Sequence, residues 1–283
     1  MIIVDLNQVM ISNFMTQIGN HTNIPIDESL LRHMVLNSLR SYNAKFRNEY
    51  GEMIIACDDK NNWRKQIFPY YKANRKKDRE KSEIDWNRIF EIMNKIRSEL
   101  KEYFPYRVIQ IDTAEADDVI GTLVHNFGNT SVKILIISGD KDFKQLQSYM
   151  NVRQYDPVRK KFLQENNPDR YLKEHIMKGD RGDGVPNFLS KDDVFVLNGR
   201  QKPLRQAKID VWINQEPESF CDENMLRGWK RNEQLVDLNF IPSNIRESVM
   251  EVYEAQSGKS RDKLFNYFIA NKLKNLMEAL NEF

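Results

Sequence analysis

Apolar residues in the first half of the chain follow two spacings that alternate along the sequence. Short, nearly continuous apolar runs, typical of buried strands, occur at residues 2–4, 53–57, 108–111 and 132–137. Between these runs, apolar residues recur every three or four positions over 28–50, 86–104 and 119–127, which predicts amphipathic helices. Pro105 and Gly128 mark the ends of the last two helices. Such alternation predicts an α/β fold with a mostly parallel central sheet flanked by helices.

After residue 150 the sequence predicts a β-hairpin and then a helical region. Residues 152–155 and 161–163, separated by Asp156-Pro157, predict a β-hairpin. Beyond Asp183 we expect a helix that Ser243 caps and Gly258 stops, and a last helix with apolar residues from Leu264 to Leu280. No Gly/Ser-rich linker separates the two parts of the sequence. We therefore expect an α/β core at 1–183, which includes a basic segment at 60–81, and a helical region at 184–283.

Composition narrows the class of protein. The chain has 283 residues and a mean hydropathy of −0.66, and it lacks the apolar run of about 18 residues that a transmembrane helix needs. Its first apolar run, Met1 to Val4, is too short for a secretory signal peptide. The two cysteines, Cys57 and Cys221, are too few for a disulfide framework. We therefore expect no membrane association and a reducing, cytoplasmic environment.

Positive charge is concentrated in one segment. The net charge of the chain is +2, but Lys60 to Lys81 holds nine basic residues against two acidic ones, a net +7 that leaves −5 for the remainder. A charge run alone is most often a solvated face or a loop. Here Tyr71 and Lys72 place an aromatic ring beside a cation, a pair that suits single-stranded nucleic acid or a frayed end. The segment is therefore a candidate binding surface for a polyanion.

Nine carboxylates follow predicted strands or stand at the ends of predicted helices. They are Asp5, Asp58, Glu115, Asp117, Asp118, Asp140, Asp142, Asp180 and Asp183. Since the carboxyl ends of parallel strands share one edge of a sheet, we expect these side chains to converge there. So many negative charges need strongly raised pKa values or a compensating cation. Oxygen ligands of this kind suit Mg²⁺ or Mn²⁺.

Each acidic motif has a purely structural alternative when it stands alone. Glu115 to Asp118 would serve as a helix-capping cluster, because acidic residues favour helix N-termini. The alternate acids Asp140 and Asp142 fit an ordinary turn, and the glycines around Asp180 fit a helix stop. Their combination at one predicted sheet edge favours a functional site.

The order and spacing of these motifs resemble the flap endonuclease and 5′ nuclease family, and most closely its phage ribonuclease H branch. The markers are Asp5, Asp58 before W-R and Y-Y-K-x-N-R, E-A-D-D at 115–118, S-G-D-K-D-F at 138–143 and G-D-x-x-D at 179–183. The resemblance extends from Ile2 to about Gly184, with weaker likeness beyond it. It implies a PIN-like 5′ nuclease core, a helical arch at 60–81 and a helical C-terminal region.

The resemblance also implies two magnesium sites, which manganese would be able to fill. A tighter site would use Asp5, Asp58, Asp117 and Asp118, with Glu115 and Asp140 shared or nearby. A looser site would use Asp142, Asp180 and Asp183. Asp117, Lys72 and Arg64 are implied as catalytic residues, with Lys72 and Arg64 touching the scissile phosphate.

The same resemblance assigns a nucleic-acid surface. Arg64, Tyr71, Lys72 and Arg75 are implied arch contacts, with Tyr71 stacking on a terminal base. Lys76 and Lys77 of the same basic run are further candidates for binding nucleic acid. Much of the family has a glycine-rich hairpin after G-D-x-x-D that binds duplex through potassium. Here residues 184–191 lack that hairpin, so we expect no potassium site and expect duplex binding to rely on Lys178, Arg181, Lys191 and later basic residues.

The implied activity is two-metal hydrolysis of RNA·DNA and DNA·DNA duplexes from the 5′ side, with flap cleavage and removal of RNA primers in phage DNA replication. We expect a monomer in the cytoplasm, that of the host cell if a phage encodes the chain, and a single-strand-binding protein or sliding clamp as a candidate partner. Two alternatives remain open. A PIN- or toprim-type nuclease acting on other nucleic acid does not explain the Tyr-Lys-Arg arch, and a non-catalytic junction-binding protein does not need the acids.

Overall fold

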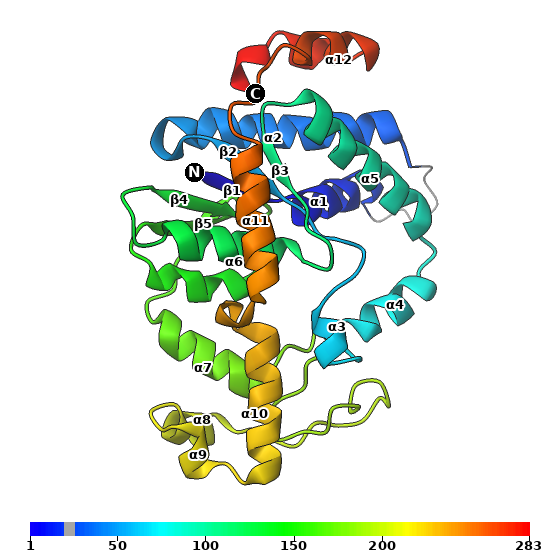
Figure 1. Cartoon of the computed structure of the whole chain (residues 1–283). Coiled ribbons are helices and arrows are strands. Elements are labelled where there is room, and N and C mark those ends of the chain that lie inside the picture. The colour runs from blue at the N-terminus through cyan, green and yellow to red at the C-terminus, as the bar shows by residue number, and fades with distance from the viewer. Residues whose placement is uncertain (20–25) are drawn as a thin grey trace.

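The computed structural model describes residues 1–19 and 26–283, which form one central sheet with helices on both faces (Figure 1). The strands are β1 (Ile2–Asp5), β2 (Met53–Ala56), β3 (Arg107–Ile109), β4 (Ile134–Ile137), β5 (Val152–Asp156) and β6 (Lys161–Leu163). Their order in the sheet is β3-β2-β1-β4-β5-β6, and only the β5–β6 pair is antiparallel. The predicted mostly parallel α/β sheet is confirmed.

The apolar strand sequences follow from burial on both faces. All residues of β1, β2 and β4 are buried, which is why these strands read as continuous apolar runs. One face packs against α1 (Leu6–Ile18), α2 (Glu28–Tyr50) and α5 (Trp86–Tyr103). The other face packs against α6 (Ala116–Phe127), the 3-10 helix η1 (Lys141–Ser148) and α11 (Ser243–Ala255). The result is a three-layer core.

The predicted helices at 28–50, 86–104 and 119–127 are confirmed as α2, α5 and α6, although α6 begins earlier, at Ala116. The apolar pattern of the sequence predicts no helix or strand between the first strand and residue 28. The structure has α1 there, which starts directly after Asp5 and buries Leu6, Val9, Met10, Phe14 and Ile18. Asp5 accepts a hydrogen bond from the backbone N–H of Gln8 and thereby caps this helix.

A lower helical layer follows the hairpin (Figure 1). It consists of α7 (Pro168–Lys178), α8 (Gln206–Trp212), α9 (Pro217–Phe220) and α10 (Glu223–Val236). Its core includes Met177, Phe188, Ile209 and Trp229. The chain then passes through η2 (Leu238–Phe240) and α11 back to the sheet, so that α10 and α11 run one after the other along the molecule.

The chain ends in α12 (Leu264–Ala270), α13 (Lys274–Met277) and η3 (Leu280–Glu282). The prediction of one last helix is wrong, because Lys272 adopts a left-handed backbone with φ +55° between α12 and α13. The predicted Ser243 cap is also wrong: α11 begins at Ser243, Pro242 occupies the capping position, and no side chain caps it within the described residues. The helix ends at Ala255, before Gly258.

The C-terminal elements pack into both layers of the core. Leu264, Phe268 and Phe283 join the cluster beneath α2 and α5, whereas Ile245 and Val249 of α11 join the cluster beneath α6. The division of the chain near residue 183 stays a prediction. Within the part of the chain that the structure describes, no helix combines the length and apolar character that crossing a membrane requires.

The basic segment 60–81, which we call the arch, folds as α3 (Arg64–Ile67) and α4 (Ala73–Glu80). Lys72, with φ +56°, turns the chain between the two helices. The part before Lys72 is packed, because Phe68 and Tyr71 are buried against Val185, Leu235 and Val236. By contrast, α4 buries none of its residues.

Candidate active site

Four of the predicted metal ligands lie together at the carboxyl edge of the sheet. Asp5 ends β1, Asp58 follows β2, Asp140 follows β4, and Asp117 lies in the first turn of α6. The strand β1 lies between β2 and β4, so this is the point where the strand order reverses and open α/β sheets bind ligands. The four carboxylates line a cavity of about 500 Å³, which we call the four-acid cavity.

Local hydrogen bonds fix the direction of two of these carboxylates. Asp5 accepts hydrogen bonds from the Gln8 backbone N–H and the Ser138 hydroxyl, both at 3.1 Å. Asp58 accepts from the Ala116 backbone N–H at 2.7 Å and from the Asn7 side-chain amide. All of these donors are neutral, so they orient the acids without balancing their charge.

Burial and mutual repulsion disfavour ionisation of the four acids. Burial, with repulsion from Asp58, raises the pKa of Asp5 to about 7. Burial and Asp142 raise the pKa of Asp140 to about 6. Burial and Asp140 raise the pKa of Asp117 well above its usual range, and burial also raises the pKa of Asp58. A divalent cation in the cavity would relieve this repulsion, and carboxylate oxygens are suitable ligands for one.

Cations of the arch line the same cavity as the acids. Lys72, Arg75 and Arg79 line it together with the rings of Trp86 and Phe90. The Lys72 ammonium lies 2.5 Å from Glu115 Oε1 and 3.5 Å from Asp183 Oδ2. Arg75 donates to Asp183 Oδ1 at 2.5 Å. These ion pairs connect the arch to the core.

Tyr71 completes this connection. Its hydroxyl lies 3.0 Å from Glu115 Oε2 and 3.1 Å from Asp183 Oδ2. We call Tyr71, Lys72, Arg75, Glu115 and Asp183 the arch clamp. Burial alone would raise the pKa of Glu115, but Lys72 and Arg64 lower it to about 2. Burial of Asp183 outweighs Lys72 and Arg75, so its pKa is raised.

The ring of Tyr71 is buried, and its stacking on a terminal base stays a prediction. Only 3% of Tyr71 is exposed, so in this conformation the ring has no open face on which a terminal base would stack. Its hydroxyl instead holds two acids of the arch clamp. The sequence marks Tyr71 as aromatic and adjacent to a cation but does not indicate which way the ring points.

Asp118 and Arg64 form a buried pair beside the site. Asp118 is fully buried, and its carboxylate accepts hydrogen bonds from the Arg64 guanidinium at 2.8 and 3.1 Å and from Trp63 Nε1 at 3.1 Å. Arg64 is buried as well and also donates to the Leu235 carbonyl at 3.0 Å. Neither side chain lines the four-acid cavity. The pair supports Glu115, which Arg64 contacts at 3.1 Å. Metal binding by Asp118 and phosphate contact by Arg64 stay predictions.

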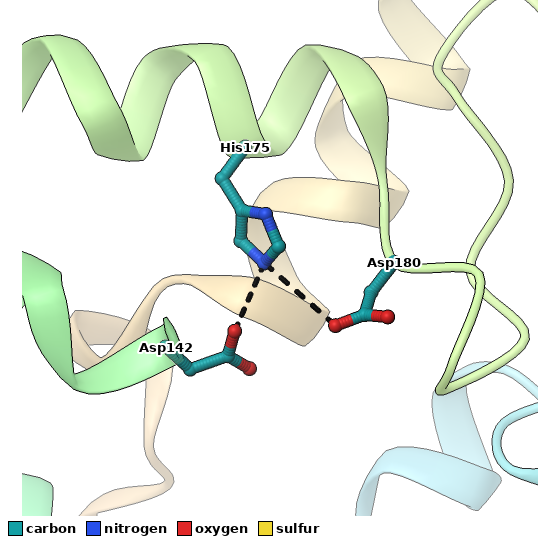
Figure 2. Close-up of side chains that lie close together, drawn as sticks. All are labelled: Asp142, His175 and Asp180. Atoms are coloured by element: carbon teal, nitrogen blue, oxygen red, sulfur yellow. Dashed lines mark ion pairs between the residues drawn. The ribbon is translucent and has the colours of Figure 1, made fainter. Parts of the chain in front are cut away.

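Two of the remaining acids, Asp142 and Asp180, do not line the four-acid cavity and gather around a histidine. Asp142 lies in η1 and Asp180 follows the end of α7, with His175 of α7 between them (Figure 2). Sequence reasoning missed His175; its position five residues before Asp180, in the last turn of the preceding helix, is the signal that would have found it. Lys141 lies 3.0 Å from Asp180 and, against the effect of burial, lowers its pKa.

The other predicted nucleic-acid contacts lie outside the four-acid cavity. Lys76 is exposed, 3.9 Å from Glu80, and Lys77 donates to the Val196 carbonyl at 3.1 Å. Lys178 pairs with Glu174, the Arg181 guanidinium lies 5.9 Å from the Phe195 ring centre, and Lys191 is exposed. Their binding of nucleic acid stays a prediction.

Comparison with known proteins agrees with this arrangement. A model of the family "5′-3′ exonuclease, N-terminal resolvase-like domain" matches residues 1–177, well over half of the chain. The chain belongs to this family. A second model, "T4 RNase H, C terminal", matches residues 167–283. The resemblance found in the sequence motifs is therefore confirmed.

Individual members of the 5′-3′ exonuclease family extend the comparison. Ribonuclease H of Enterobacteria phage T4 is 34% identical, over 99% of this chain and 95% of its own length. A 5′-3′ exonuclease of Buchnera aphidicola is 27% identical over 58% of each chain. Among solved structures, the zinc-bound T5 5′-exonuclease has a TM-score of 0.60 at 17% identity, covering 91% of this chain and 99% of its own, which shows a shared fold.

Proposed function

We propose that this protein is a divalent-metal-dependent 5′-3′ exonuclease and flap endonuclease that hydrolyses RNA·DNA and DNA·DNA duplexes and removes RNA primers during phage DNA replication. The four-acid cavity, faced by the cations of the arch, is the observation that supports this function most directly. Family membership supports the reaction class. The relative from phage T4 carries the name ribonuclease H.

The donor set fits two magnesium ions, with manganese as a substitute. Asp5, Asp58, Asp117 and Asp140 would hold the first, and Asp142 and Asp180, with Asp183 nearby, would hold the second. When bound, such ions activate water and neutralise phosphate charge. Raised pKa values, as for Asp5, Asp117 and Asp140, are expected for clustered carboxylates whose negative charge a bound cation would compensate.

The residues of the chain would position the phosphate. Lys72 and Arg75 line the cavity together with the four acids, so a phosphodiester bound there would meet positive charge where negative charge develops in the transition state. Both cations are held by Glu115 and Asp183 in the structure. A bound substrate would therefore exchange a carboxylate partner of these cations for a phosphate partner.

Asp117→Asn tests the function. The variant should lose cleavage of 5′-labelled RNA·DNA, nicked duplex and flap substrates in millimolar magnesium while keeping its fold. Asp112→Asn, which removes an exposed acid from the same connection, is the matched control and should cleave normally. Cleavage by Asp117→Asn at the wild-type rate would remove Asp117 from the site. Binding of branched DNA without any metal-dependent cleavage by the wild type would favour a junction-binding protein.

We also propose that helix α12 carries a docking surface for a protein partner. Phe265 and Ile269 of α12 are half-exposed and lie one helical turn apart, a surface to which a single-strand-binding protein or a sliding clamp would be able to dock. We propose that the protein otherwise acts as a monomer in the cytoplasm of the host cell. Loss of co-elution with either partner in Phe265→Ser, with normal nuclease activity, would support this docking surface, and unchanged co-elution would contradict it.

A further inference from the structure

His175 occupies a position that the proposed two-magnesium site does not require. Its Nε2 atom lies 3.0 Å from Asp142 Oδ1 and 4.0 Å from Asp180 Oδ2. Figure 2 shows the imidazole pointing from α7 toward both carboxylates. One donor atom from each residue lies within 4.8 Å of the other two. We call these three residues the His175 cluster.

The central atoms of this cluster are buried without a hydrogen bond. Only 7% of His175 is exposed. Although Nε2 and Asp142 Oδ1 are close, their alignment does not make a hydrogen bond, and neither atom has another hydrogen-bond partner among residues 1–19 and 26–283. Buried polar atoms are nearly always paired, so two adjacent unpaired ones indicate that something else belongs between them. A cation accepts lone pairs from both at once.

The surroundings favour an imidazole held ready as a ligand. The Tyr171 ring stacks on His175, with ring centres 5.8 Å apart and an angle of 15° between the planes, which fixes the direction of Nε2. Lys141 pairs with Asp180, but its side chain is 47% exposed and is free to swing toward solvent when a cation arrives. The Lys141 ammonium thus supplies part of the positive charge that a bound ion would replace.

We propose that His175 is a direct nitrogen ligand of the second divalent ion and shifts the preference of that site from magnesium toward manganese and other transition metals. This inference rests on the proposed function, in which Asp142 and Asp180 hold the second ion. Magnesium favours an all-oxygen shell, whereas imidazole nitrogen suits transition metals. The two sites would then differ in selectivity, with the four-acid cavity remaining an oxygen site.

Pulsed electron paramagnetic resonance of the full chain with Mn²⁺ tests the ligand directly. With two equivalents bound, the wild type should show ¹⁴N coupling from a coordinated imidazole. His175→Gln should lose this coupling, while His33→Gln, which alters a histidine of α2, should keep it. Two bound Mn²⁺ ions without ¹⁴N coupling, or binding of only one Mn²⁺ at saturation, would overturn the proposal.

Calorimetric titration tests the selectivity. His175→Gln should weaken Mn²⁺ binding at the second site about tenfold or more, the scale at which altered coordination support changes metal affinity, and should leave Mg²⁺ affinity nearly unchanged. Equal weakening for both metals would mean that His175 only positions Asp142. Cleavage in magnesium, measured in parallel, separates the two hypotheses: a wild type that does not cleave refutes the proposed function, whereas an active wild type without ¹⁴N coupling refutes only the nitrogen ligand. A thermal melt of His175→Gln confirms that the variant is folded.

Discussion

Lys72 is the residue at which the arch and the acidic core meet, and its contacts separate it from the other basic residues of the arch. Its ammonium lies between Glu115 and Asp183, largely shielded from solvent, whereas the Lys76 side chain is 79% exposed. The carboxylates raise the pKa of Lys72 in spite of its burial, so the ammonium stays charged. A positive charge held at a fixed position stabilises the negative charge of the transition state. A charge on an exposed surface side chain contributes mainly to the affinity for the phosphate backbone.

Lys72→Ala should therefore lower the rate of single-turnover cleavage by about tenfold to a thousandfold, the scale of one lost electrostatic stabiliser. Substrate affinity should change little, because one cation contributes a small part of total phosphate binding. Lys76→Ala is the matched control and should leave the chemical step nearly unchanged. Single-turnover rates and binding isotherms for both variants check this, and equal effects through affinity alone would contradict the role of Lys72.

The raised pKa values of the four acids predict how the stability of the metal-free protein depends on pH. The pKa of Asp5 rises from its ordinary value of 3.8 to about 7 on folding. Between those values the folded state holds a proton that the unfolded state has lost, so raising the pH favours unfolding. Without metal, the protein should lose stability as the pH rises from 5 through about 7. Asp140, with a pKa of about 6, adds to this loss.

Melting temperatures in a chelator and in magnesium, at pH 6 and pH 8, check this sign. The stabilisation by magnesium should be larger at pH 8, where the acids must otherwise stay ionised against one another. Asp117→Asn should raise the melting temperature in chelator at pH 8, because it removes one member of the repulsive group. A metal-free protein that is more stable at pH 8 than at pH 6 would contradict the cause that we assign.

At the scale of elements, the buried pair of Arg64 and Asp118 joins α3, α6 and the end of α10. Arg64 belongs to α3, Asp118 to α6, and the carbonyl that Arg64 also contacts, that of Leu235, belongs to α10. Burying both charges is tolerable because each is paired and hydrogen-bonded. The pair therefore fixes how the base of the arch sits on the core.

Arg64→Ala should lower the free energy of unfolding by about 3–5 kcal/mol, since it leaves the buried Asp118 carboxylate unpaired. Arg75→Ala is the control: its side chain is half-exposed and its loss should cost little stability. Urea unfolding of both variants distinguishes them. If Arg64→Ala loses cleavage at unchanged stability, Arg64 contacts the substrate and the structural role assigned here is wrong.

The sequence predicted the elements of the core but not the direction in which side chains such as Arg64 point. Strands and most core helices were predictable, because burial on two faces gives apolar runs and burial on one face gives helical spacing. The convergence of Asp5, Asp58, Asp117 and Asp140 followed from parallel strands. The inward direction of Arg64, Tyr71 and Asp118 depends on contacts with residues 44 to 171 positions away. Local spacing carries no information about such contacts. His175 is a different case, because its position five residues before Asp180 is a local signal that was overlooked.

At the scale of the whole molecule, charge is divided between two regions. The arch contains nine basic and two acidic residues and therefore carries a net charge of +7. The net charge of the whole chain is only +2. The acids of the site and three cations of the arch line the same cavity. Binding of a nucleic acid should therefore depend on the arch and its neighbours and not on the overall charge of the protein.

Binding to branched DNA should accordingly weaken steeply with salt, because each phosphate that a cation neutralises releases condensed counterions. In a plot of log affinity against log salt concentration, Lys76→Ala/Lys77→Ala should reduce the slope by about 0.9 for each phosphate that is no longer neutralised. Both side chains lie on α4, the solvent-exposed half of the arch. Lys274→Ala, which removes one charge from the distant α13, is the control and should leave the slope unchanged. Measurements in calcium or chelator keep cleavage from altering the substrate. A flat salt response of the wild type would argue against a polyanionic substrate, and an unchanged slope for the double variant would place the phosphate-binding cations elsewhere, at Lys178, Arg181 and Lys191.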